Sequence, residues 1–128
     1  MSASAADDGV VASGVCLVDV EEAERLLASD GGGLFTEGEL RYARERVDPA
    51  RRLAARLAAK RAACRLLGGD AAEREVEVRR GAFGPPSLRL FGAAEARMRA
   101  LGASRALVSL THERTRAAAL VVLLRDTR

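Results

Sequence analysis

The sequence predicts one α+β domain in which a mainly antiparallel sheet is covered by helices. Three observations lead to this prediction. An apolar, β-branched segment lies at 10–20, three segments with helical spacing follow it, and residues 73–124 return largely to strand-like patterns. At 128 residues the chain has room for one such domain, which we expect at 10–126 behind a disordered tail at 1–9.

The first half is predicted to form a strand and three helices. The strand is VVASGVCLVDV at 10–20, and the helices cover 21–29, 36–46 and 50–67. The triple glycine at 31–33 ends the first helix. Thr36 and Glu39 have the spacing of a capping box at the start of the second. Asp48-Pro49 opens the long third helix, and Gly68-Gly69 closes it.

The second half is predicted to add four strands and one helix. The strands cover 73–79, 87–90, 105–110 and 117–124, and the helix covers 93–101. The turn-rich segment GAFGPP joins the first two strands, which indicates a hairpin. Gly102 ends the helix. The predicted order of elements is therefore β-α-α-α-β-β-α-β-β.

The composition favours a soluble cytoplasmic protein. The formal net charge of +3 comes almost entirely from arginine, a bias typical of a GC-rich genome, so we expect no nucleic-acid partner. Cys16 and Cys64 are expected to be small buried hydrophobes in a reducing compartment. No apolar run is long enough for a membrane span, and the acidic start MSASAADDG is unlike an export signal.

Lys60, the only lysine of the chain, falls in the apolar stripe of the long helix. Its stem could lie along the apolar surface and carry the ammonium to solvent. Alternatively, the ammonium points into a cleft and holds an anion, most plausibly a phosphate. Arg61 lies at the edge of the same stripe, where an arginine is ordinarily a solvated flank.

Two further positions could carry chemistry. Asp19 ends the first strand, where a carboxylate can bind a metal ion, although Asp19 and Glu22 also have the spacing of a helix cap. The segment SLTHE at 109–113 leaves a later strand and holds His112, the only histidine. A single histidine is either structural or a group that changes charge near neutral pH.

Taken in order, these pieces resemble the holo-acyl-carrier-protein synthase family, the small 4′-phosphopantetheinyl transferases. The resemblance covers residues 14–124. The matching segments are GVCLVDVEEAERL, LFTEGEL, LAARLAAKRAACRLLGG, GPPSLRLFGAAEARMRALG and VSLTHERTRAAALVVL. It implies the 4′-phosphopantetheinyl transferase-like fold. It also implies transfer of the phosphopantetheine arm of coenzyme A to a serine of an apo acyl carrier protein, with release of 3′,5′-ADP.

The family resemblance also implies Mg²⁺, a homotrimer and a set of site residues. Asp19 matches the metal-binding aspartate, and Lys60 matches a lysine on the coenzyme A phosphates. Arg25 matches a basic position that meets the acidic carrier protein. The positions that match the nucleotide site are Gly84, Pro86, Ser109 and His112. Phosphoryl transfer suits such residues, because it depends on positioning and on neutralising phosphate charge.

Arg61 departs from the family pattern, in which a glutamate that binds the metal follows the lysine. Two unit charges about 4 Å apart interact by about 4 kcal/mol at an effective dielectric constant of about 20, so an inward Arg61 would oppose Mg²⁺ strongly. Three hypotheses stay open. The chain is a working transferase in which Asp19, Lys60 and Arg61 serve catalysis, a non-catalytic protein that binds acyl carrier protein or coenzyme A, or a scaffold turned to other chemistry on a carrier-bound acyl chain.

Overall fold

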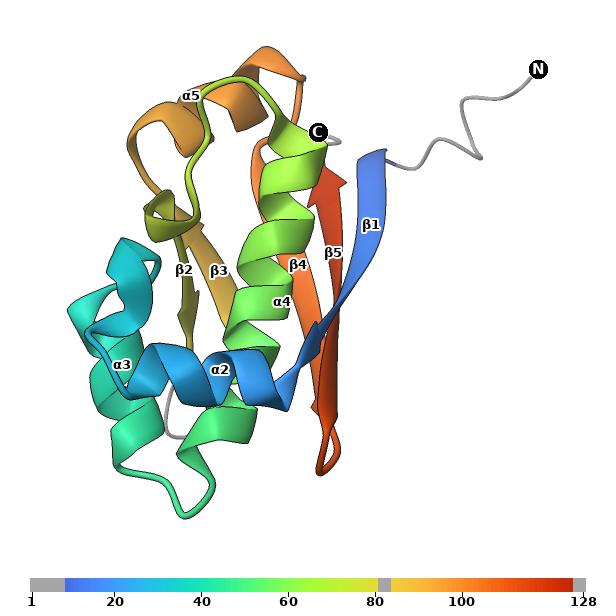
Figure 1. Cartoon of the computed structure of the whole chain (residues 1–128). Helices are drawn as coiled ribbons and strands as arrows, with labels where there is room; N and C mark the ends of the chain where they lie inside the picture. The colour runs from blue at the N-terminus through green and yellow to red at the C-terminus, as the bar shows by residue number, and fades with distance from the viewer. Residues whose placement is uncertain (1–8, 81–83, 126–128) are drawn as a thin grey trace.

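The structure, a computed structural model, describes residues 9–80 and 84–125. Residues 1–8 of the expected tail, the predicted turn at 81–83 and residue 126 lie outside the described residues. The strands and helices are β1 (Val10–Asp19), α2 (Val20–Leu27), α3 (Glu37–Arg44), α4 (Pro49–Leu67), β2 (Val76–Arg79), β3 (Ser87–Leu90), α5 (Gly92–Ala100), β4 (Arg105–His112) and β5 (Arg116–Leu124) (Figure 1). The predicted order of elements is confirmed.

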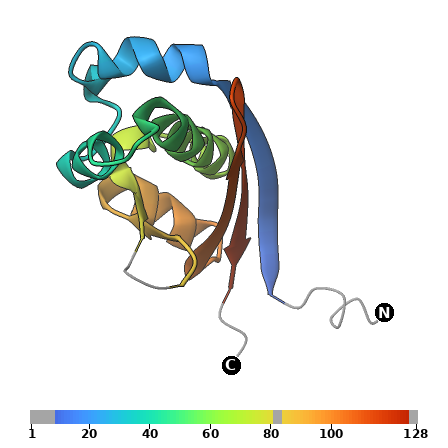
Figure 2. The same ribbon diagram turned by 90° about the horizontal axis from the view of Figure 1, so that it is seen from below.

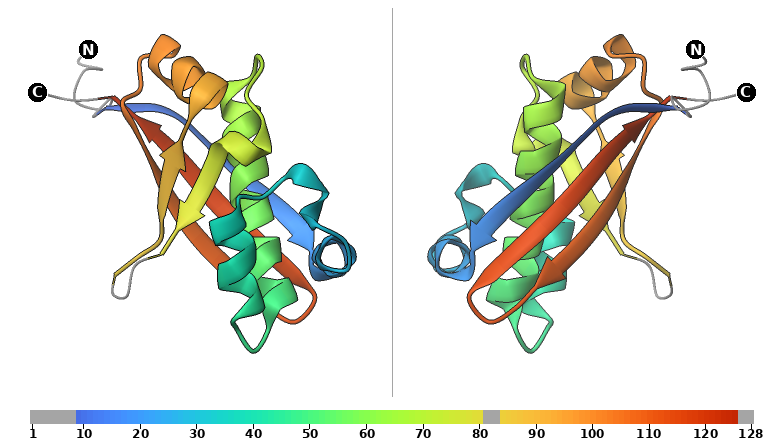
Figure 3. Two further views of the ribbon diagram at one scale, coloured as in Figure 1. Left: turned by 90° about the vertical axis from the view of Figure 1, so that its left-hand side faces the viewer. Right: turned by 90° about the vertical axis from the view of Figure 1, so that its right-hand side faces the viewer.

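The described strands form two antiparallel sheets. The larger has the order β1-β5-β4 and the smaller pairs β2 with β3. In the larger sheet Leu120 of the central strand β5 pairs with Val15 of β1. The same residue pairs with Ser109 of β4. All helices lie on one side of this sheet, as Figures 2 and 3 show. The predicted α+β class and the predicted helical cover are thus confirmed.

Helix α4 is the centre of the core. Pro49 occupies its first turn, where a missing N–H costs no hydrogen bond, and Gly68 ends it at φ +68°, a conformation that favours glycine. Most of the buried residues of α4 are alanine and leucine, and the helix packs against β1 and β5. Two exceptions among the buried residues are Arg56 and Lys60.

Several predicted boundaries differ from the structure by one or two residues, and the strand predicted at 105–110 continues to His112. Val20 belongs to α2 and not to the first strand. The predicted strand at 73–79 starts with a short 3₁₀ turn, η2 (Glu73–Glu75), before β2. The reason is a contact with a later segment, because the Glu75 carboxylate accepts hydrogen bonds from the N–H groups of Ala93 and Ala94 as well as from that of Ala72. These bonds hold the turn against the first turn of α5, so the chain cannot extend there.

The outer face of the three-stranded sheet carries apolar side chains that the described chain leaves exposed. Side chains alternate between the two faces of a strand, so one set packs under α4 and the other points outward. The outward set includes Val15, Leu17, Leu107 and Leu120, each between 41% and 63% exposed. Exposed apolar side chains gathered on one face are a feature that needs an explanation, whereas single ones are ordinary.

The two cysteines are free thiols. Cys16 is buried in the core and Cys64 is partly buried, close to the expected placement. Burial raises the pKa of the Cys64 thiol to about 11, so this side chain is a neutral thiol at neutral pH. Among the described residues, no helix is both long and apolar enough to cross a bilayer.

Candidate functional site

Lys60 does not carry its ammonium to solvent, one of the two alternatives left open by the sequence, because the ammonium is held inside the protein. Its side chain is fully buried, and Nζ lies 2.7 Å from Glu39 Oε1 and 2.5 Å from the carbonyl oxygen of Val76. Burial lowers the pKa of the ammonium, and the Glu39 carboxylate opposes this shift. Lys60 lines neither the cavity beside Asp19 nor the two cavities beside Arg56. Its contact with phosphate therefore stays a prediction.

Glu39 joins three elements around this lysine. The capping box with Thr36 is present as predicted, since the Thr36 hydroxyl accepts from Glu39 N–H and Glu39 Oε1 accepts from Thr36 N–H. The other carboxylate oxygen accepts from Val78 N–H at 2.8 Å. Glu39 thus ties α3 to α4 and to β2. The cap was predicted from the sequence, whereas the ion pair between Glu39 and Lys60 was not.

Asp19 lies at the end of β1, as predicted, and its side chain is available to ligands. It holds the N-cap position of α2, but its carboxylate makes no capping hydrogen bond. The side chain is 70% exposed, with Oδ1 3.4 Å from Arg116 Nε. Asp19 lines an open cavity of about 380 Å³ together with Arg114 and Arg116. Asp19 is therefore the N-cap residue by its backbone position, but its side chain does not cap the helix.

Arg61 is paired with a carboxylate on α2. Its Nη1 lies 3.0 Å from Glu22 Oε1 and its Nη2 lies 2.5 Å from Glu22 Oε2. This two-pronged geometry is the strongest form of a guanidinium–carboxylate pair. The hydrogen bond to Arg61 holds the pKa of Glu22 below its usual value, and the same bond raises the pKa of Arg61. Arg61 is thus an ordered cation and not a loose solvated flank.

The residues at this corner do not fit the Mg²⁺ site that the family resemblance implies. Mg²⁺ prefers oxygen ligands and is usually held by one or two carboxylates together with phosphate oxygens and water. Here Glu22 is paired with Arg61 and Asp19 lies beside Arg116. Within the part of the chain that the structure describes, no group of three or more metal-binding side chains is found. A cation would have to compete with two guanidinium groups.

A second cavity, of about 310 Å³, has the chemistry of an anion site. It lies between α3, α4 and β4, and its lining includes Tyr42, Arg52, Arg56, Arg80 and His112. Arg56 is only 3% exposed, and its guanidinium carbon lies 3.9 Å from the centre of the Tyr42 ring. Two buried nitrogen atoms, Arg56 Nε and His112 Nδ1, have no hydrogen-bond partner among the described residues. Buried polar atoms are nearly always paired, so these two indicate a missing ligand or water.

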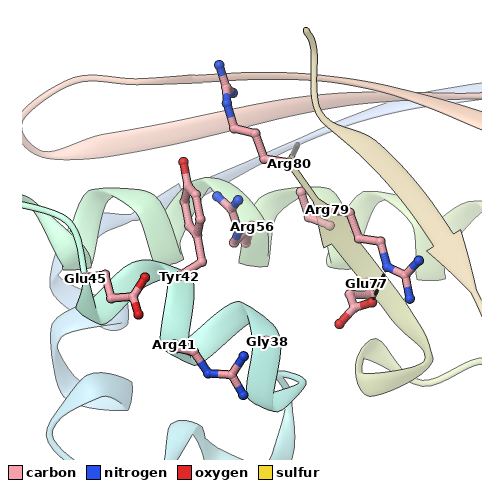
Figure 4. A pocket seen from close by; sticks show the side chains of 9 residues that line it. Gly38, Arg41, Tyr42, Glu45, Arg56, Glu77, Arg79 and Arg80 are labelled. Carbon is pink, nitrogen blue, oxygen red and sulfur yellow. Dashed lines mark hydrogen bonds and ion pairs between the residues drawn. The ribbon is translucent and has the colours of Figure 1, made fainter. Parts of the chain in front are cut away.

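An adjoining cavity of about 530 Å³ extends this basic region. It shares Tyr42, Arg56 and Arg80 with the 310 Å³ cavity. Its lining also includes Arg41 and Arg79. Figure 4 shows the Arg56 guanidinium beside the Tyr42 ring, with Arg79 turned toward Glu77. Burial lowers the pKa of Arg56 from its ordinary value, but an arginine keeps its charge at neutral pH. Arg56 was not among the predicted site residues, although it lies one helical turn before Lys60.

The other predicted site residues are not all brought together. His112 lines the arginine-rich cavity, whereas Ser109 is exposed on the opposite face of β4 among the apolar residues. Gly84, at φ +92°, is exposed and Pro86 is partly buried, just before β3. Arg25 is exposed in the last turn of α2. The roles predicted for these residues remain predictions.

The fold and the cavity together define a small α+β protein with a cavity lined largely by arginine. No protein-family model matches the chain. A holo-[acyl-carrier-protein] synthase of Nitratidesulfovibrio vulgaris is 40% identical over 121 residues, covering 83% of this chain and 94% of the relative. The chain belongs to the holo-[acyl-carrier-protein] synthase family.

Solved structures agree with this assignment. The crystal structure of holo-[acyl-carrier-protein] synthase from Neisseria meningitidis has a TM-score of 0.76 and 26% identity, over 91% of this chain and 99% of that one. A Bacillus anthracis holo-(acyl-carrier-protein) synthase in complex with CoA (3′,5′-ADP) has a TM-score of 0.74 and 22% identity, over 92% and 99%. The fold predicted from the family resemblance is confirmed.

Proposed function

We propose that this chain transfers the 4′-phosphopantetheine arm of coenzyme A to a serine of an apo acyl carrier protein. Membership of the holo-[acyl-carrier-protein] synthase family supports the reaction. The observation that carries it at the site is the pair of unpartnered buried nitrogen atoms, Arg56 Nε and His112 Nδ1, in one arginine-lined cavity. A phosphate oxygen would accept from the Arg56 Nε–H group, and from His112 Nδ1 in the tautomer that carries its proton there.

In this reaction the carrier serine oxygen attacks a phosphorus of the diphosphate of coenzyme A. A new P–O bond forms to the serine, the bond to the bridging oxygen breaks, and 3′,5′-ADP leaves with the electron pair. We assign the nucleotide end to Arg56 and His112. Asp19, exposed at the end of β1, is the group that accepts the serine proton. Arg61 then offsets charge on the diphosphate.

The carrier protein is the second substrate. Acyl carrier proteins are acidic, and this chain carries a formal charge of +3. Arg25 is exposed on α2, the helix that follows Asp19 directly, so a partner held at Arg25 would lie beside the strand end. Charge complementarity of this kind speeds encounter more than it tightens binding.

The proposed assembly is a homotrimer in the cytoplasm. The exposed apolar face of the three-stranded sheet supports self-association, because burying Val15, Leu17 and Leu120 removes apolar surface from water. Ser109 lies in the same face, so a neighbouring copy would cover it. Two free cysteines suit a reducing compartment.

A second function has its own supporting observation. Arg61 takes the place of the family glutamate and is locked to Glu22, which favours a protein that binds coenzyme A or acyl carrier protein without catalysis. One experiment separates the transferase from the non-catalytic binding protein. The chain is incubated with coenzyme A, Mg²⁺ and apo carrier protein, and the carrier is weighed by mass spectrometry, with a serine-to-alanine carrier as control. A mass gain of one arm supports the transferase; binding of coenzyme A without mass gain supports the second function.

A further inference from the structure

The corner formed by the end of β1, the first turn of α2 and the middle of α4 already holds its own positive charge. Glu22 is bound through both oxygens to Arg61, and Asp19 lies 3.4 Å from Arg116. The Arg61 side chain is 28% exposed, so solvent reaches it, and the two hydrogen bonds to Glu22 set its orientation. An arginine stays protonated at any pH at which a protein folds. The corner therefore carries a permanent cation.

Arg61 can contact a second anion without releasing Glu22. A guanidinium has five N–H groups in one plane, and the pair with Glu22 occupies two of them. The bidentate bond fixes the plane of the group and thus the direction of the remaining donors. Planar guanidinium groups suit phosphate oxygens for this reason. A divalent cation in the same place would have to approach this charge.

We infer that this chain binds coenzyme A without a divalent cation, with the Arg61–Glu22 pair occupying the position of a metal ion. The inference rests on the proposed function, since it concerns the same substrate. In this arrangement Arg61 excludes a metal ion from the corner, and Glu22 positions the Arg61 guanidinium. Glu22 thereby has a role that neither the family resemblance nor the sequence spacing assigned to it.

The test uses the full chain and two measurements. Coenzyme A is titrated calorimetrically in EDTA and in Mg²⁺, and binding of Mn²⁺ alone is followed by electron paramagnetic resonance. For the wild type, the affinity for coenzyme A is expected to agree within about twofold in the two conditions, with no stoichiometric Mn²⁺ site. A tenfold loss of affinity in EDTA, or one tightly bound Mn²⁺ per chain, would overturn the inference.

Two variants isolate the charge at residue 61. Arg61→Glu places a carboxylate beside Glu22 and near the strand end, and is expected to gain Mn²⁺ affinity at least tenfold over Arg61→Gln, which removes the cation alone. Equal Mn²⁺ affinity in the two variants would overturn the role of Arg61. If Arg61→Glu fails to fold, the wild-type titrations still decide. Absence of coenzyme A binding in both conditions would refute the proposed function as well, whereas binding that needs Mg²⁺ would refute this inference alone.

Discussion

Lys60 and Glu39 form an ion pair with neither side chain exposed, the ammonium nitrogen 2.7 Å from the carboxylate oxygen. The pair answers why a helix directs a lysine toward the core, because Glu39 enters the same space from α3. The carbonyl of Val76 and the N–H of Val78 complete the polar contacts. This network fixes α3, α4 and β2 around the cavity lined by Arg56, which is also on α4.

Breaking this pair is expected to destabilise the fold. Lys60→Met leaves the Glu39 carboxylate buried without its cation, a change that costs about 3–5 kcal/mol of unfolding free energy. Urea unfolding followed by circular dichroism measures it. The double variant Lys60→Met with Glu39→Gln removes both charges and should lose less than the sum of the two single changes. Additive losses, or a loss below about 1 kcal/mol for Lys60→Met, would show that the two charges are not coupled.

The Arg61–Glu22 pair predicts a pH dependence of stability. The hydrogen bond to Arg61 lowers the folded-state pKa of Glu22 below its ordinary 4.5. The stabilisation is therefore complete above pH 4.5 and is lost as the pH falls through the folded-state pKa. Because both side chains are about one-third exposed, we expect only about 0.5–1 kcal/mol near neutral pH.

Glu22→Gln tests this dependence. Its unfolding free energy is compared with that of the wild type near neutral pH and in steps down to about pH 3, where the difference should shrink toward zero. Glu21→Gln, an exposed change in the same helical turn, serves as the control. A difference that stays constant over this range would mean that the charge of Glu22 is not what stabilises the pair.

Arg56 is predicted to contribute directly to binding of coenzyme A. Arg56→Gln removes a charged donor that faces the cavity, and a hydrogen bond to a charged group is worth about 1.5–3 kcal/mol. The dissociation constant for coenzyme A should rise at least about tenfold by calorimetry. Arg99→Gln, on the exposed side of α5, removes the same charge elsewhere and should change it little. If both changes raised the dissociation constant equally, Arg56 would act only through the net charge of the protein and not by direct contact.

The exposed sheet face is predicted to hold the trimer together. Leu17→Glu places a charge on the apolar face and should convert a trimer into monomers, measured by light scattering after gel filtration. Val47→Glu is the control, since Val47 is fully exposed in the loop between α3 and α4. A wild type that is monomeric, or a Leu17→Glu protein that stays trimeric, would refute this assembly.

Local patterns in the sequence were enough to predict most of the fold. Apolar spacing, the capping box at Thr36 and the glycines after α4 act over a few residues, so they can be read directly. Contacts between distant segments could not be read this way. Glu39 pairs with Lys60 across 21 positions and Glu22 pairs with Arg61 across 39, and nothing in either local pattern specifies its partner. The η2 turn was missed for the same reason, since Glu75 bonds to α5.

The predicted site was only partly recovered for a related reason. Asp19 and His112 end strands, and strand ends are simple to place. Ser109 is three residues before His112, and the alternation of a strand puts the two on opposite faces. Arg56 escaped notice because an arginine in an arginine-rich helix stands out only once its burial is known.

A crystal structure of this chain grown with coenzyme A and Mn²⁺ tests the central claim most directly. The account predicts phosphate oxygens within hydrogen-bond distance of Arg56 and His112, and anomalous scattering that shows no manganese between Asp19 and Arg61. Coenzyme A bound away from Arg56 and His112, or a manganese ion held at that corner, would contradict it.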